Sequence, residues 1–163
     1  MIRIWHKHGD IYLLSLSHRD AGVVFPAIMR VAADRIPEDE LSRNTQLSAC
    51  ELEKTAEDFL AIVRDNLAQD CSFTGSLGEL HWSPRMRKEP GSWLTADVYL
   101  HDERILLGVD RRRLEAMIWI MCRLAADFDD VAFLEIVGCN KTEVLSLALD
   151  AQLLLEVLQE CEG

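Results

Sequence analysis

One apolar run constrains the fold of this chain more than any other feature. Between Leu114 and Ala126 only Glu115 and Arg123 are charged, and the run is too long for an ordinary strand. Asp110 stands just ahead of it, where an aspartate can cap the first turn of a helix. A helix that is apolar on most sides lies among other elements. We therefore expect a central helix that is buried on more than one side.

The length and composition fit one compact domain around that helix. The chain has 163 residues, 49% of them hydrophobic, with only 8 Gly and 4 Pro. Chains of this size usually form one globular unit, and the composition excludes the disordered and fibrous classes. We expect a single globular domain over residues 1–163.

Alternating apolar residues and turn signals predict the other elements. Strands are expected over residues 2–5, 11–16, 79–82, 93–100 and 105–109. Two capping boxes, Ser17-x-x-Asp20 and Ser48-x-x-Glu51, open helices. The first covers residues 21–33, and Pro26 has to lie in its first turns or force a kink. The second carries an apolar stripe as far as Leu67.

Two interpretations compete for the last third of the chain. Residues 131–137 are rich in β-formers, Gly138 to Lys141 can turn, and leucines alternate at 145, 147 and 149. This pattern favours a hairpin followed by a helix that Asp150 caps, and a continuous helix over residues 142–160 is the alternative. With the hairpin, the chain has an α+β fold with a largely antiparallel sheet and three to four helices packed on one face.

The charge is acidic and unevenly distributed. The chain carries 28 Asp and Glu against 17 Lys and Arg, a net charge of −11, which disfavours direct binding to a nucleic acid backbone. Two clusters, Glu38-Asp39-Glu40 and Asp127 with Asp129 and Asp130, lie at expected element ends, where they can face a basic partner. Trp82 and Trp93 flank a loop that contains Arg85, Arg87 and Lys88, and Trp with Arg is typical of interface hot spots. The candidate partner-binding residues are therefore Glu38, Asp39, Glu40, Asp127, Asp129, Asp130, Trp82 and Trp93.

No recognised catalytic or cofactor motif accompanies these clusters. The sequence lacks a GxSxG elbow, a phosphate-binding glycine loop and any CxxC pair among its 5 cysteines. His6 and His8 form the one alternative metal site, because their spacing of two would place both imidazoles on the same face of a strand. We therefore expect no cofactor and favour a protein that is not an enzyme.

The N-terminus has no apolar segment followed by a small-residue cleavage site. No stretch approaches the roughly 18 uninterrupted apolar residues that a transmembrane helix needs. These features predict a cytoplasmic chain with no membrane partner.

In general character, a small, acidic, cytoplasmic α+β chain without catalytic motifs is similar to bacterial toxin-immunity proteins. The similarity lies in no motif, so it assigns no residue roles. It implies a non-catalytic inhibitor that occludes a basic toxin or nuclease-like enzyme. The alternatives are a small metal-dependent enzyme using the N-terminal histidines, a nucleic-acid mimic, and a self-assembling structural or regulatory subunit such as a homodimer.

Overall fold

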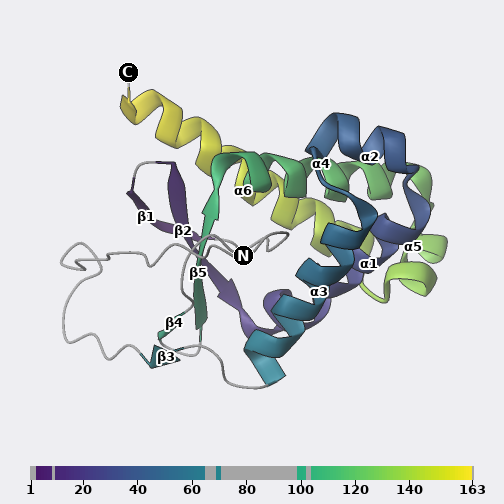
Figure 1. Ribbon diagram of the computed structural model, residues 1–163, viewed down its shortest axis with the longest axis horizontal. Coiled ribbons are helices and arrows are strands. Elements are labelled where there is room, and N and C mark those ends of the chain that lie inside the picture. Colours follow the sequence, from purple (N-terminus) through teal and green to yellow (C-terminus); the bar gives the residue numbers. More distant parts are fainter. Residues whose placement is uncertain (1–2, 9, 65–68, 71–98, 102–103, 163) are drawn as a thin grey trace.

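The computed structural model describes residues 3–8, 10–64, 69–70, 99–101 and 104–162 (Figure 1). The strands are β1 (Arg3–His8), β2 (Ile11–Ser17), β3 (Gln69–Asp70), β4 (Tyr99–His101) and β5 (Arg104–Asp110). The helices are the π-helix η1 (Asp20–Val24), α1 (Phe25–Arg35), α2 (Glu38–Thr45), α3 (Ala49–Arg64), α4 (Arg111–Asp127), α5 (Asp130–Val137) and α6 (Lys141–Glu162).

The strands form one sheet in the order β1-β2-β5-β4-β3. The pairings of β1 with β2, β2 with β5 and β4 with β5 are antiparallel, and the short β3 pairs with β4 in parallel. The antiparallel pairs β1–β2 and β4–β5 join strands that the sequence predicted, although β1 extends to His8 and only residues 99–100 of the strand expected over 93–100 are described. The register places Tyr12 opposite Val109 and Leu14 opposite Leu107, so these four side chains share one face of the sheet.

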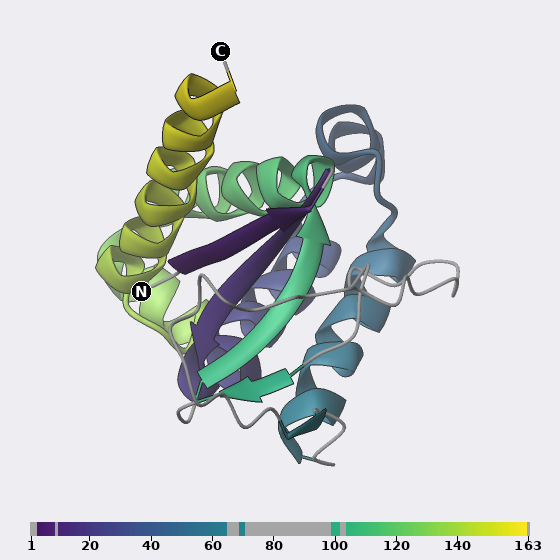
Figure 2. The ribbon, with the colours of Figure 1, turned by 90° about the vertical axis from the view of Figure 1, so that its left-hand side faces the viewer.

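That face carries the hydrophobic core. Side chains from η1 and from every α-helix in the described residues join Tyr12, Leu14 and Leu107 in one buried cluster. Figure 2 shows the strands in front of the helices, with α6 along one edge. The predicted central helix α4 contributes Leu114, Met117, Ile120, Met121 and Leu124 to this cluster. Asp110 caps α4 as expected, because its Oδ1 accepts a hydrogen bond from the backbone N–H of Arg113 at 2.7 Å.

Both predicted capping boxes hold helix starts. The N–H of Asp20 donates to Ser17 Oγ at 3.0 Å. The N–H of Glu51 donates to Ser48 Oγ at 3.1 Å, and the N–H of Ser48 donates back to Glu51 Oε2 at 2.7 Å. The first helix differs from the expectation in its opening turn, which is the π-helix η1, and Pro26 then lies at the start of α1. Val24 and Phe25 already have helical φ and ψ angles, so Pro26 lies inside a continuous run of helical backbone. The hydrogen bonding changes from π to α at this point, where proline has no N–H to donate.

The predicted hairpin over residues 131–149 is wrong. Residues 131–137 belong to α5, and the leucines at 145, 147 and 149 belong to α6. Asp129 caps α5 by accepting from the N–H of Ala132 at 2.8 Å, and Gly138 ends it in the left-handed conformation with φ 81°. The continuous helix was the correct alternative, so the described residues contain six α-helices where three to four were expected. The chain is an α+β protein with more helix than its pattern predicted.

The predicted strand over residues 79–82, both candidate tryptophans and the basic loop between them lie outside the described residues. Among the helices that are described, none combines the length and the apolar composition needed to cross a bilayer.

Candidate functional site

Arg123 brings the two predicted acidic clusters together. Its Nε donates to Glu40 Oε1 at 2.6 Å and its Nη2 to Glu40 Oε2 at 3.3 Å, while its Nη1 forms an ion pair with Asp127. Since Glu40 opens α2 and Asp127 ends α4, these contacts join two helices that are far apart in sequence. We call the surface formed by the six clustered acids the acidic end; it comprises Glu38, Asp39, Glu40, Asp127, Asp129 and Asp130.

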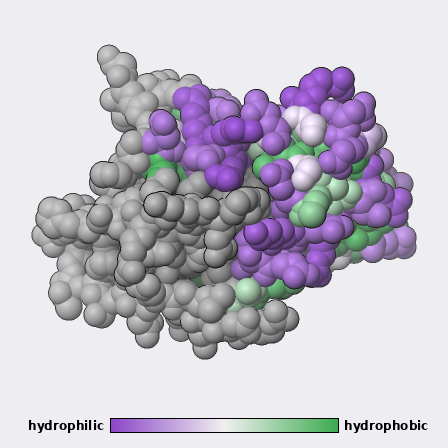
Figure 3. All heavy atoms as spheres, in the orientation of Figure 1, coloured by the Kyte–Doolittle hydropathy of each residue, from purple (hydrophilic) through white to green (hydrophobic). Residues whose placement is uncertain are grey.

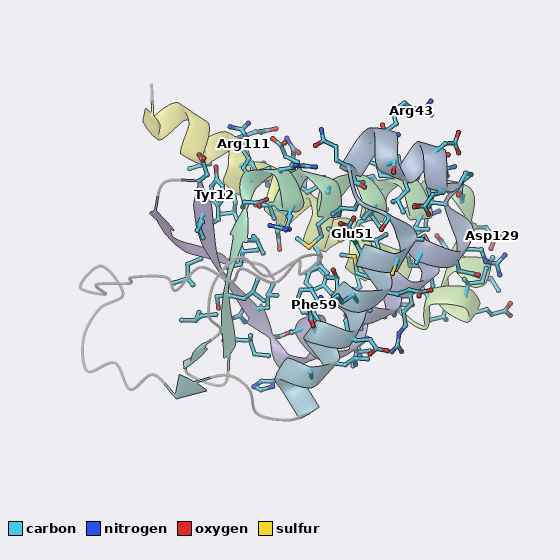
Figure 4. All side chains as sticks on the ribbon, viewed as in Figure 1. Tyr12, Arg43, Glu51, Phe59, Arg111 and Asp129 are labelled. Carbon is cyan, nitrogen blue, oxygen red and sulfur yellow. The ribbon has the colours of Figure 1, made fainter. Side chains whose placement is uncertain are left out.

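The charges of this bridge reinforce one another. Hydrogen bonds from Arg123 lower the pKa of Glu40, and the bonds to Glu40 and Asp127 raise the pKa of Arg123. Three ionised groups in contact fix the start of α2 against the end of α4. Figure 1 shows α2, this end of α4 and α5 gathered at the same end of the molecule, and Figure 4 places Arg43 and Asp129 there.

The other acids differ in what they contact. Both carboxylate oxygens of Glu38 accept from the N–H of Ala49 at 3.2 Å, and Asp129 caps α5. Asp130 is 3.9 Å from Lys141 Nζ with 89% of its side chain exposed. Asp39 is also exposed, and within the described part of the chain it has no hydrogen-bond or ion-pair partner. Asp39 and Asp130 are therefore the two acids most available to a partner.

Apolar side chains directly follow the second cluster. Val131 is 69% exposed and Leu134 is 47% exposed, one helical turn apart on α5. Large apolar groups next to a charged rim are the usual composition of a protein interface. The sequence-based prediction missed this pair because it assigned residues 131–137 to a strand. The spacing of three between Val131 and Leu134, and of four between the buried Phe133 and Val137, is helical.

A groove lies between α1 and α5 beside this pair. It has a volume of about 410 Å³. Its lining is Arg30, Val31, Asp34, Arg35, Glu135 and Ile136. Both signs of charge line it, with apolar contacts from Val31 and Ile136, so it can receive a protruding side chain of a partner. Figure 3 shows that the right-hand side of the molecule, where Figure 1 places α2 and α5, is mostly hydrophilic on this face, with smaller hydrophobic areas between the polar groups.

The described residues do not form the metal site that His6 and His8 suggested as an alternative. His6 and His8 lie on β1, opposite Leu13 and Ile11 of β2 in the register. In the part of the chain that the structure describes, no three His, Cys, Asp or Glu residues come together as metal ligands. Cys50, Cys122 and Cys139 are free thiols, and burial raises the pKa of Cys139.

The six acids can thus be placed, and Trp82 and Trp93 fall outside the described residues. Three residues that the sequence did not mark complete the surface: Arg123, Val131 and Leu134. No family model, curated protein or solved structure matches this chain.

Proposed function

We propose that this protein is a non-catalytic binding protein whose acidic end covers a basic surface on a protein partner, in the manner of an immunity-type inhibitor. The observation that supports it most is the exposure of Val131 and Leu134 directly after Asp130, within a surface whose acids are held on helices. An apolar contact beside negative charge suits a protein surface better than a small ion or a metal.

The two kinds of side chain have different roles in this proposal. Exposed acids such as Asp39 and Asp130 steer a basic partner and raise the association rate, an effect that salt weakens. Val131 and Leu134 contribute apolar burial, which salt affects little. Occlusion needs no chemical step, so binding alone would inhibit an enzyme whose active cleft is basic.

The test is a pair of charge-matched variants. Asp39→Lys with Asp130→Lys reverses the two available acids, and Glu53→Lys with Glu57→Lys makes the same charge change on the exposed side of α3. Each tagged protein is used in a pull-down from lysate of the cells that produce it, with washes at low and at high salt. The purified partner is then titrated against each variant by calorimetry.

We expect the Asp39/Asp130 variant to raise the Kd by about tenfold or more, and the Glu53/Glu57 variant to change it by less than about threefold. Val131→Ser should weaken binding with little dependence on salt. Equal Kd values for the two double variants would show that net charge alone attracts the partner, and the proposed surface would be wrong.

A further inference from the structure

Helix α6 is apolar on two opposite sides. One side packs in the core through Val144, Leu147, Ala148, Ala151 and Leu155. The other side carries four large apolar residues with exposed fractions between 40% and 59%, which we call the α6 ridge: Leu145, Leu149, Leu153 and Val157. Figure 2 shows α6 along one edge of the molecule.

The spacing of the α6 ridge selects the shape of what can cover it. The four residues follow one another at steps of four, so they form a continuous row along roughly 18 Å of the helix. A row of this kind fits the groove between the rows of a second helix, with a crossing angle near −50° in the commonest packing class. An amphipathic helix with apolar anchors at helical spacing is therefore the complementary shape.

Charge then selects the chemistry of that helix. From residue 142 to residue 162 the chain has five acidic residues and no Lys or Arg. Glu143 is held by Arg19, which donates to both of its carboxylate oxygens at 2.9 and 3.1 Å. Glu156 is exposed beside the row and accepts from Gln152 at 2.9 Å. A second copy of α6 would bring acids against acids, and an anionic lipid surface would repel them.

We propose that the α6 ridge binds a basic amphipathic helix of a protein partner, with leucine-like anchors on the ridge and Lys or Arg beside the acids. This surface is separate from the acidic end, and the inference does not rest on the proposed function. It names a second contact that a partner can make, through a helix of its own and not through a folded basic surface.

The probe is a synthetic, fluorescently labelled peptide of about 18 residues, with leucines on one side of the helix and lysines on the other. A peptide of the same composition with its leucines spread around the helix is the comparison. Binding to the full-length protein is measured by fluorescence anisotropy. The test variant is Leu149→Gln with Leu153→Gln, since glutamine keeps a high helix propensity. Val23→Gln makes the same kind of change at an exposed apolar residue of η1, outside both the α6 ridge and the acidic end.

We expect the ordered peptide to bind more tightly than the scrambled one, and the Leu149/Leu153 variant to weaken it by about tenfold or more. The Val23 variant should change the affinity by less than about threefold. All three substituted positions are exposed, so both variants should fold, and thermal unfolding verifies that they do.

Three outcomes would overturn the inference. The first is a failure of either binding comparison: the protein binds the ordered and the scrambled peptide equally tightly, or the wild type and the Leu149/Leu153 variant bind the ordered peptide equally tightly. The second is a dimer in sedimentation experiments that this variant dissociates, because the occupant would then be a second copy. The third is flotation with phosphatidylcholine or phosphatidylglycerol vesicles that the same variant abolishes, because the occupant would then be lipid.

Discussion

The acidic end and the α6 ridge differ in how far their side chains are free to contact a partner. At the acidic end, Glu40 and Asp127 pair with Arg123, Glu38 holds the N–H of Ala49, and Asp129 caps α5. On the α6 ridge, Leu149 and Leu153 are at least half exposed to solvent. Charged clusters that look available in the sequence are largely used inside the molecule, whereas part of its apolar surface is left open.

This difference has a simple physical origin. Glu38 and Asp129 satisfy N–H groups at the starts of α3 and α5, which have no partner within the helix. Glu40 and Asp127 instead pair with the guanidinium of Arg123. Acids placed at element ends therefore acquire structural contacts even at the surface. An apolar side chain on the outer side of a helix has no such contact to make within its own chain. The comparison can be tested by changing one residue of each kind at a time.

The largest expected effect is a difference in stability between two leucine substitutions on the same helix, α6. Leu147 is 3% exposed and packs in the core, whereas Leu149 belongs to the ridge. Leu147→Ala should lower the free energy of unfolding by about 2–5 kcal/mol through lost burial and a cavity. Leu149→Ala should change it by less than about 0.5 kcal/mol. Denaturant titration of both variants measures the difference, and a large loss from Leu149→Ala would mean that the ridge is already covered in solution.

An intermediate effect should follow from removing the link between the acidic clusters. Arg123→Met leaves the carboxylates of Glu40 and Asp127 near each other without their shared cation. We expect the Tm to fall by about 2–4 °C at neutral pH, and by less in high salt, which screens the repulsion. Arg112→Met is the matched control on the exposed side of the same helix. Equal shifts for the two variants would contradict the structural role given to Arg123.

The smallest effect concerns pH. The pKa of Glu40 is lowered by Arg123, so the ionised carboxylate favours the folded state above its unfolded pKa of about 4.3. That contribution is lost as the pH falls through the lower pKa of the folded state. The Tm of Glu40→Gln should therefore lie about 1–2 °C below wild type near neutral pH, and the two values should converge as the pH falls through the lowered pKa of Glu40 in the folded state. Thermal unfolding measured from neutral to acidic pH tests this expectation, with Glu53→Gln as the control. A Tm difference that stays constant across the pH range would show that ionisation of Glu40 is not involved.

Local signals predicted much of this fold. Ser48 and Glu51 cap α3 reciprocally, Asp110 caps α4, and β1 pairs antiparallel with the strand that follows it, β2. Each of these depends on residues within a few positions of one another, so a single sequence carries the information. The position of the six acids at helix ends was equally local.

What the sequence could not supply depends on contacts across the chain. The alternating leucines at 145, 147 and 149 match a strand as well as a helix that is apolar on two sides, and only packing against α4 decides between them. Arg123 links Glu40 to Asp127. The hydrophobic pattern of the sequence placed Arg123 in an apolar helix but gave no sign of which acids it would contact. The α6 ridge could not be separated from core leucines before the helix was known.

Gly22 in η1 carries a consequence for how this chain can vary. A Cβ atom built at Gly22 would lie 3.1 Å from Cγ1 of Val63 on α3, closer than ordinary van der Waals contact. An alanine at position 22 would therefore require the Val63 side chain to move by a few tenths of an ångström, or a smaller side chain at position 63. In natural variants of this protein, a side chain larger than hydrogen at position 22 should favour a residue smaller than valine at position 63.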